Sequence, residues 1–388
     1  MRELTWITGA GIFSFFYVAI GNTLALGAWR RSASQHWAVR ARLLWPVRVA
    51  STSLGWYLPI AAALTWSLTD RSTPLLLLVL AALVSAIGCE IGSLPLQRQT
   101  FPRFSVTALL RSTALGLFFR FFHISVLLLA AALMPVHPTP TMAVIAGAVF
   151  AFELIWSLAG WVWLLRLLKF LTPASARLKT VVETASRQTG IEYPRVWIMR
   201  SQFAQALALP ATRELVFTER LLEIMSDLEL SAICAHELAH INESKSALIV
   251  RIASMFAWYP CIFIIPVVHA WGSIGAYLLL AVGAFAPKLF GAFSRRMEQA
   301  ADSHATSQQT DEGIYARALL RLNEDSLTPV VLQGQGTSHP HTYDRVIAAG
   351  IVPDFERPEA PASMAWHGML ASIAVGAAIA LFVIHVLQ

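Results

Sequence analysis

Long apolar runs separated by short polar segments dominate the pattern of this chain. About 20 consecutive apolar residues are enough to cross a bilayer as a helix, and runs that approach or exceed this length recur along the sequence. The expected membrane helices cover residues 4–28, 47–68, 74–94, 114–134, 141–166, 247–268, 271–290 and 364–386. Prolines interrupt the pair at 247–268 and 271–290, so this pair could also form a hairpin or a re-entrant element. The pattern predicts an integral membrane protein with about eight transmembrane helices.

The composition supports this prediction. Of the 388 residues, 56% are hydrophobic and 13% are charged, against roughly 25% charged residues in a typical soluble protein. These values exclude a disordered chain, a coiled coil and an ordinary soluble enzyme. The net charge of +6 is scattered over loops, which favours a lipid bilayer as the partner and argues against nucleic acid. The three cysteines form no CxxC pair and no disulfide framework.

Basic residues in the short loops predict the orientation of the helices. They gather in the first and third loops and directly after the fifth helix, whereas the second and fourth loops hold almost none. We therefore expect the odd-numbered loops to face the cytoplasm and both termini to lie outside. The segments 168–246 and 291–363 are then cytoplasmic, and they carry nearly all of the soluble-type sequence.

Local signals within these two segments predict a small domain of helices and strands. Pro173 after a threonine predicts a helix start, and this helix runs to about Gln188, with Gly190 as its C-terminal cap. Ser226 followed by Glu229 is a capping box, which opens a helix that runs through residue 245 and continues into the sixth membrane span. The expected strands cover residues 195–199, 206–209 and 215–218.

The helix opened by Ser226 carries the sequence HELAH at residues 236–240. His236 and His240 lie about 40° apart on one helix face, the spacing at which two imidazoles bind one zinc ion. Glu237 lies about 100° round from His236, close enough to act on a water at the metal without being a ligand. The motif arises by chance in roughly one in a hundred such chains. The motif alone therefore leaves a polar patch at the membrane surface as an alternative.

A catalytic zinc site needs a third protein ligand and an open fourth position. The next polar cluster contains Glu298 and Asp302, four residues apart on one predicted helix face. Glu298 can bind the metal, while Asp302 can accept a hydrogen bond from a ligand imidazole. The alternative is an amphipathic surface helix with charges at this spacing. The chain has only 23 acidic residues, so two of them at this spacing after HELAH are unexpected by chance. The surface helix is therefore the weaker alternative.

A third polar cluster lies further along the chain, where Ser338, His339 and Pro340 are followed by Arg345. A histidine and an arginine on one loop can stabilise the oxyanion that forms when water attacks a carbonyl group. A solvated loop histidine is the alternative for His339.

Ionisable residues also occur within the expected membrane helices, where they are functional candidates by default. Glu153 lies in the middle of the fifth helix, and a pair with Arg120 or His123 of the fourth helix would account for it. We expect Arg120 and Arg251 to extend toward the cytoplasmic face of the membrane.

The order of the three motifs resembles that of a known group of enzymes. HELAH at 236–240, EQAAD at 298–302 and SHP at 338–340 followed by Arg345 are similar to the HExxH, ExxxD and HP-x4-R pattern of membrane zinc metalloproteases. The group in question is the HtpX heat-shock and CAAX prenyl endopeptidase type, an HExxH gluzincin. The resemblance covers about residues 195–350.

This resemblance implies a zinc-dependent enzyme with one zinc ion per chain. It assigns His236, His240 and Glu298 as zinc ligands, Glu237 as the catalytic base, Asp302 beside a ligand imidazole, and His339 with Arg345 near the oxyanion or the substrate. The implied fold is a mainly α integral membrane protein with a small α+β zincin-like catalytic domain at the cytoplasmic face. The metalloprotease domain would cover 168–363, interrupted by a membrane hairpin at about 247–290, between a five-helix transmembrane region at 1–167 and a C-terminal transmembrane helix at 364–388.

The expected function is hydrolysis of peptide bonds in membrane or membrane-proximal proteins, as in membrane protein quality control. The expected location is the bacterial inner (plasma) membrane, and the strand near 205–209 would pair with an extended protein or peptide substrate. Two alternatives stay open. One is a signalling protease whose five N-terminal helices sense a ligand and which cleaves a cytosolic regulator. The other is a transporter or scaffold with a structural zinc, for which a closed site of four protein ligands is expected.

Overall fold

The computed structural model describes residues 2–50, 75–103, 105–332 and 340–362, and its chain forms two compact units. The expected span at 364–386 and most of the one at 47–68 lie outside the described residues. Unit 1 comprises Met1–Leu117, Leu327–Pro329 and Pro358–Gln388, and unit 2 comprises Phe118–Ser326 and Val330–Arg357.

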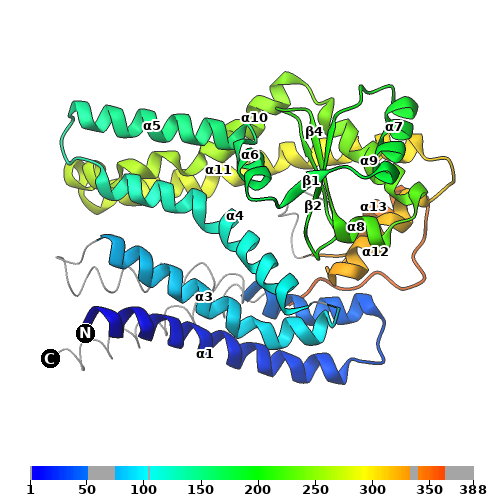
Figure 1. The fold of residues 1–388 in the computed structure, drawn as a ribbon, viewed down its shortest axis with the longest axis horizontal. Helices are drawn as coiled ribbons and strands as arrows, with labels where there is room; N and C mark the ends of the chain where they lie inside the picture. The colour runs from blue at the N-terminus through cyan, green and yellow to red at the C-terminus, as the bar shows by residue number, and fades with distance from the viewer. Residues whose placement is uncertain (1, 51–74, 104, 333–339, 363–388) are drawn as a thin grey trace. The chain divides into compact units, whose positions relative to one another are not determined.

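Unit 1 contains two long helices, α1 (Arg2–Arg31) and α3 (Leu75–Thr100), which lie side by side (Figure 1). Glycines allow this close approach: a Cβ atom at Gly88 would lie 2.3 Å from the carbonyl oxygen of Gly11. A Cβ atom at Gly92 would lie 2.6 Å from the carbonyl oxygen of Phe15. Small residues four apart are a common device for packing helices in a membrane, because backbones can then touch.

Four helices of the described part are long and apolar enough to cross a membrane. They lie where the sequence predicts the first, third, fifth and sixth membrane helices. Their bounds are Glu3–Arg31, Val79–Thr100, Pro140–Ser157 and Lys245–Gly272. The fourth expected helix is part of α4 (Val106–Leu133). The structure therefore confirms a membrane protein that is mainly helical.

Two expected spans differ from the helices in the structure. The fifth span ends early, because Ala159 takes a left-handed conformation with φ of 65° and a left-handed residue ends a right-handed helix. The chain forms α5 (Pro140–Ser157) and then a short α6 (Gly160–Leu167). The separate span at 271–290 is instead part of α11 (Ile264–Gln308), which kinks at Gly272 with φ of 63°. Before it come α10 (Lys245–Met255) and the 3-10 helix η1 (Phe256–Phe263).

Helices α4 and α5 share a buried polar pair. His123 Nε2 lies 3.0 Å and 2.8 Å from the two carboxylate oxygens of Glu153, and the Glu153 side chain is 1% exposed. The His123 ring also stacks on Trp156. The expectation that Glu153 pairs with a residue of the fourth helix is confirmed, with His123 as its partner.

The soluble part of unit 2 is built on a four-stranded sheet in the order β1-β2-β4-β3. The strands are β1 (Leu171–Pro173), β2 (Arg195–Met199), β3 (Ala206–Leu209) and β4 (Glu214–Thr218). β2 and β4 are parallel, whereas β1 and β3 run antiparallel to their neighbours. The expected strands at 195–199, 206–209 and 215–218 are confirmed, and β3 forms an edge of the sheet.

The predicted helix start at Pro173 is wrong. Thr172 pairs with Ile198 of the neighbouring strand, so this short segment forms β1, and a three-residue strand has too little pattern to be recognised without its partner. The helix α7 (Ala176–Thr189) begins three residues later, where the Ser175 hydroxyl accepts a hydrogen bond from the Leu178 amide. Its C-terminal cap is Gly190 with φ of 68°, as predicted.

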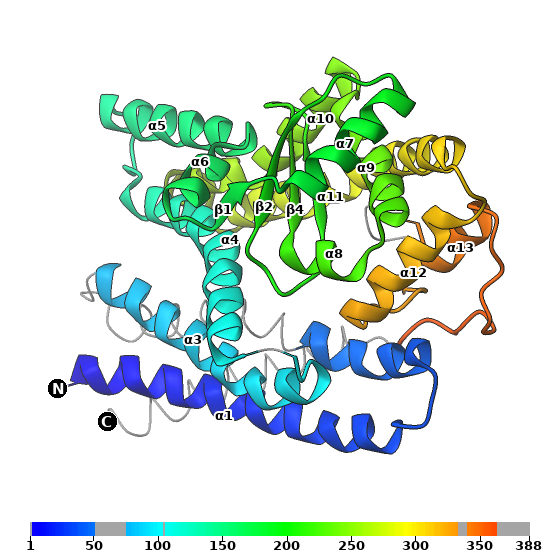
Figure 2. The same ribbon diagram turned by 45° about the vertical axis from the view of Figure 1, so that its right-hand side comes forward.

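Helix α9 (Asp227–Ile241) begins with the predicted capping box between Ser226 and Glu229. It packs against α7 beside the sheet (Figure 2). The prediction that it continues into the membrane is wrong, because it ends at Ile241 and Ser244 caps the start of α10. Three further helices complete the unit: α8 (Glu219–Ile224), α12 (Ile314–Ser326) and α13 (Thr342–Ala348).

A single hydrophobic core holds α9 in place. Leu230 and Leu238 of α9 are fully buried together with Leu178 of α7 and Phe217 of β4. Burying side chains of this size contributes about 1.5–3 kcal/mol each. The opposite face of α9, which carries the two motif histidines, is thereby held toward α11.

Candidate metal centre

The two motif histidines and Glu298 form one buried cluster. His236 and His240 come from α9 and Glu298 from α11, and one ligand atom of each lies within 4.8 Å of the others. The Nε2 atoms of the two histidines are 3.2 Å apart. Each Nε2 atom lies 3.5 Å from a different carboxylate oxygen of Glu298. The structure thus brings together the three ligands that the sequence predicts.

The remaining ring nitrogen of His236 is already engaged. His236 Nδ1 lies 2.8 Å from the Tyr315 hydroxyl and 3.1 Å from Asp302 Oδ1. With these oxygen acceptors beside it, Nδ1 carries the ring proton and leaves the Nε2 lone pair free. The structure thus places Asp302 beside His236, and the role of Asp302 at a metal ligand stays a prediction.

Asp302 belongs to a buried network with Tyr315 and Arg345. Arg345 donates from Nε to Asp302 Oδ2 at 2.8 Å and from Nη2 to Oδ1 at 2.7 Å. The Tyr315 hydroxyl donates to Asp302 Oδ1 at 2.6 Å. Burial alone would raise the pKa of the Asp302 carboxyl, but the hydrogen bonds from His236 and Arg345 outweigh it and hold that pKa well below its usual value.

His240 has a corresponding partner of its own. Its Nδ1 lies 2.5 Å from Glu243 Oε1, and Arg251 donates to the two oxygens of Glu243 at 2.8 Å and 2.6 Å. Each of the two imidazoles therefore contacts a carboxylate that is itself paired with an arginine. Burial alone would lower the pKa of His240, but the neighbouring carboxylates of Glu243, Glu298 and Glu237 raise it to about 9. The cluster is thus an environment that favours a cation.

The donor set fits a metal ion. Two imidazole nitrogens and one carboxylate, with the imidazoles oriented by outer carboxylates, form the ligand set of a catalytic zinc site with an open fourth position. Glu237 follows His236 directly and is partly exposed. Glu237 is therefore more accessible to solvent than the three residues of the cluster, which are all buried.

Comparison with known proteins agrees with this site. Residues 173–350 match the model of Peptidase family M48. This part of the chain is similar to peptidase family M48. The M48 segment contains HELAH, Glu298, Asp302 and Arg345, and it includes all four strands except the first residues of β1.

Curated relatives of the M48 segment carry the name "Protease HtpX homolog". The one from Pelotomaculum thermopropionicum is 31% identical over 166 residues, which is 38% of this chain and 58% of the relative. The one from Acidiphilium cryptum is 27% identical over 164 residues, or 39% of this chain and 57% of the relative. The chain thus spans somewhat more than half the length of these relatives. The resemblance to HtpX-type membrane zinc metalloproteases is confirmed by these matches.

In the part of the chain that it describes, the structure does not place His339 or Arg345 of the M48 segment in contact with a substrate position. His339 lies outside the described residues. The Arg345 side chain is 11% exposed, and its guanidinium is bonded to Asp302 and to the Tyr315 hydroxyl. Contact of either residue with a substrate oxyanion stays a prediction.

The sequence reasoning missed Glu243 and Tyr315. Glu243 follows His240 by three residues, a spacing that brings side chains together on a helix, so a signal was present. Tyr315 follows Asp302 by 13 residues across a turn between α11 and α12, and no local pattern marks it. Arg251, which we expected to extend toward the membrane surface, is bonded to Glu243.

Replacing Glu243 by alanine is expected to lower the zinc affinity of the M48 segment by about 10- to 100-fold, the usual cost of losing the outer partner of a ligand histidine. Titration of the purified protein against a fluorescent zinc chelator measures this. Glu183→Ala, at an exposed position of α7, is the matched control and should leave the affinity unchanged. Equal affinities of the Glu243 variant and the unmodified protein would refute the positioning role.

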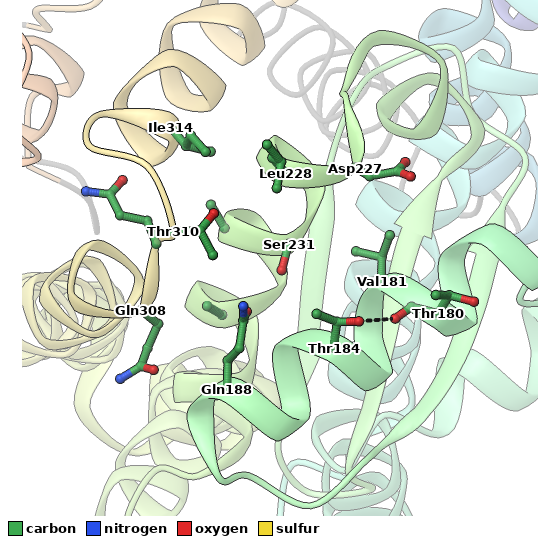
Figure 3. A pocket seen from close by; sticks show the side chains of 13 residues that line it. Thr180, Val181, Thr184, Gln188, Asp227, Leu228, Ser231, Gln308, Thr310 and Ile314 are labelled. Carbon is green, nitrogen blue, oxygen red and sulfur yellow. Dashed lines mark hydrogen bonds between the residues drawn. The ribbon is translucent and has the colours of Figure 1, made fainter.

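A separate cavity of about 210 Å³ lies between the N-terminal half of α9, α7 and the end of α11. Figure 3 shows that Thr184 and Gln188 of α7 and Ser231 of α9 line it, together with Gln308 and Thr310 at the end of α11. Among the described residues, no member of the metal cluster lines this cavity. Its lining is mostly neutral, with Asp227 as the one carboxylate among the described residues that line it.

Proposed function

We propose that this chain is a zinc-dependent endopeptidase that hydrolyses peptide bonds of membrane or membrane-proximal proteins. The observation that carries the proposal is the orientation of the ligand histidines. Both rings are engaged at Nδ1 by carboxylates, and both Nε2 atoms lie beside Glu298. The match of residues 173–350 to the model of a peptidase family gives independent support.

In the proposed mechanism, His236, His240 and Glu298 hold the zinc ion. When bound, zinc acts as a Lewis acid and lowers the pKa of water. The Glu237 carboxylate accepts a proton from the attacking water and passes it to the nitrogen of the leaving amine. The network of Asp302, Arg345 and Tyr315 fixes the ring of His236, so that the site is rigid before a substrate arrives.

An edge strand supports a peptide as the substrate. β3 pairs with β4 on one side only and packs against α9, the helix of the ligand histidines. The Thr218 amide donates to the Gln205 carbonyl at 3.0 Å, and hydrogen bonding alternates along an antiparallel pair. The amides of Ala206 and Ala208 therefore face away from β4. An extended substrate can pair with these amides as an additional strand.

Ala208→Pro is expected to lower kcat/KM for an extended peptide by about 2- to 10-fold, because it removes one backbone donor worth about 0.5–1.5 kcal/mol. The loss should appear mainly in KM, since the chemical groups are unchanged. Ala208→Gly keeps the amide and is the control, and the melting temperature of both variants shows whether the strand is intact. A proline variant with unchanged kinetics would place the substrate elsewhere.

The position of the site in the chain supports substrates at the membrane. Only three residues separate α9 from α10, and α10 opens the candidate span Lys245–Gly272. The basic loops predict that this end of the span lies in the cytoplasm. We therefore propose an integral protein of the bacterial inner membrane whose site faces the cytoplasm and whose substrates include damaged membrane proteins.

Reconstituted protein tests this proposal. We expect it to cleave an unfolded membrane protein faster than an unfolded soluble one, to lose cleavage when a chelator removes the metal, and to regain it with zinc. Equal rates on both substrates would refute the membrane preference. Persistent activity without metal would refute the metallopeptidase itself, and cleavage of a single cytosolic regulator alone would favour the signalling protease.

A further inference from the structure

Helix α6 (Gly160–Leu167) has one face buried and the other exposed, and its exposed face carries large apolar side chains. Val162 and Leu165 are 3% and 1% exposed and pack into the protein. On the other side, Trp163 and Leu167 are 66% and 62% exposed, and Leu168 directly after the helix is 53% exposed. Trp163 and Leu167 are four residues apart, so they form one apolar surface.

The chain places this surface at the end of a candidate membrane span. α5 has 18 residues, which at 1.5 Å per residue is about 27 Å, close to the thickness of the hydrocarbon core. The chain therefore reaches the boundary of the bilayer near Ser157. The left-handed conformation of Ala159 ends α5 there. Helix α6 is therefore a separate helix and does not extend the span. Tryptophan is enriched at this boundary of membrane proteins.

Basic side chains surround the apolar surface. Arg166 lies within α6 and its Cζ atom sits 4.4 Å from the centre of the Trp197 ring. Lys169 follows the helix, and the Arg200 amide donates to the Phe170 carbonyl at 3.0 Å, which holds Arg200 next to Lys169. All three basic side chains are exposed. In the described part of the chain, none of the three has an ion pair with a carboxylate.

We propose that α6 with Lys169 and Arg200 is a docking surface for anionic lipid headgroups of the bilayer that α5 enters. Trp163 and Leu167 would insert at the level of the headgroups, and the three cations would bind lipid phosphates. Because α6 leads directly into β1, this contact fixes the M48 sheet relative to the membrane surface. The proposal does not depend on peptidase activity.

Photocrosslinking in the full-length protein tests the apolar surface. A benzophenone amino acid is placed at position 163 and the protein is reconstituted in vesicles of phosphatidylcholine and phosphatidylglycerol. We expect lipid adducts near the glycerol backbone. The same group at Ile155, an exposed position of α5, should react with acyl chains, and at Val352, an exposed position after α13, with no lipid. The proposal would be overturned if the group at position 163 formed adducts with protein only, or formed no adducts at all.

A charge variant tests the lipid specificity. We expect the protein to have a higher melting temperature in phosphatidylglycerol vesicles than in phosphatidylcholine vesicles. The triple variant Arg166→Gln, Lys169→Gln and Arg200→Gln should lose at least half of this difference, because each cation near an anionic surface contributes about fivefold to lipid binding. High salt should reduce the difference in the unmodified protein as well.

A second triple variant controls for net charge. Lys179→Gln, Arg187→Gln and Arg317→Gln remove the same charge from exposed positions on α7 and α12. This variant should keep the full difference between the two lipids. An equal loss in both triple variants, or no loss in either, would overturn the specific role of the α6 surface.

Discussion

Glu237→Gln is expected to lower kcat/KM for peptide hydrolysis by about 100- to 10,000-fold, the range of a general base, without loss of zinc. Glutamine keeps the shape of the side chain but cannot take a proton from water at neutral pH. The cluster that holds the metal is formed by His236, His240 and Glu298, and the substitution leaves it intact. A quenched fluorescent peptide gives the kinetics, and elemental analysis of the purified protein gives the zinc content.

The matched control for this result is Glu223→Gln, which removes an exposed carboxylate of α8. It should change neither the zinc content nor the rate. Full hydrolysis by the Glu237 variant would refute the assigned base and with it the proposed mechanism. Joint loss of zinc and activity would instead show that Glu237 helps to hold the metal, contrary to the prediction.

Arg345→Met is expected to destabilise the M48 segment by about 3–5 kcal/mol, the usual cost of removing one partner of a buried ion pair. The side chains of Arg345 and Asp302 are 11% and 16% exposed, so water cannot replace the lost partner. The substitution leaves the Asp302 carboxylate uncompensated beside His236. We therefore also expect weaker zinc binding, measured by chelator competition, in addition to the lower free energy of unfolding.

Two comparisons make this prediction specific. The double variant Arg345→Met and Asp302→Asn removes the buried charge along with its partner, so it should recover part of the lost stability. Arg357→Met breaks the pair with Asp344, whose side chains are 47% and 52% exposed, and should cost less than about 1 kcal/mol. Similar losses from Arg345→Met and Arg357→Met would contradict the role assigned to burial.

Local signals predicted much of the fold correctly. The alternation of β-branched and aromatic residues predicted β2, and the pair of Ser226 and Glu229 predicted the start of α9. Both depend on residues close in sequence, so no partner is needed to recognise them. β1 was missed because its three residues form a strand only through pairing with β2. The turn at Ala159 was missed because a non-glycine residue with positive φ has no sequence signature of its own.

The site also combines features that the sequence determines with features that depend on tertiary contacts. The sequence by itself determined which atoms can bind a metal, because the spacing of His236 and His240 on a helix fixes their common face. It also indicated Glu298, since carboxylates are rare in this chain. The tertiary structure decided which further side chains hold these groups in place. Arg251 of α10 pairs with Glu243, which lies between α9 and α10. Tyr315 of α12 and Arg345 of α13 bond to each other and to Asp302 of α11. Such contacts depend on packing that no local pattern encodes.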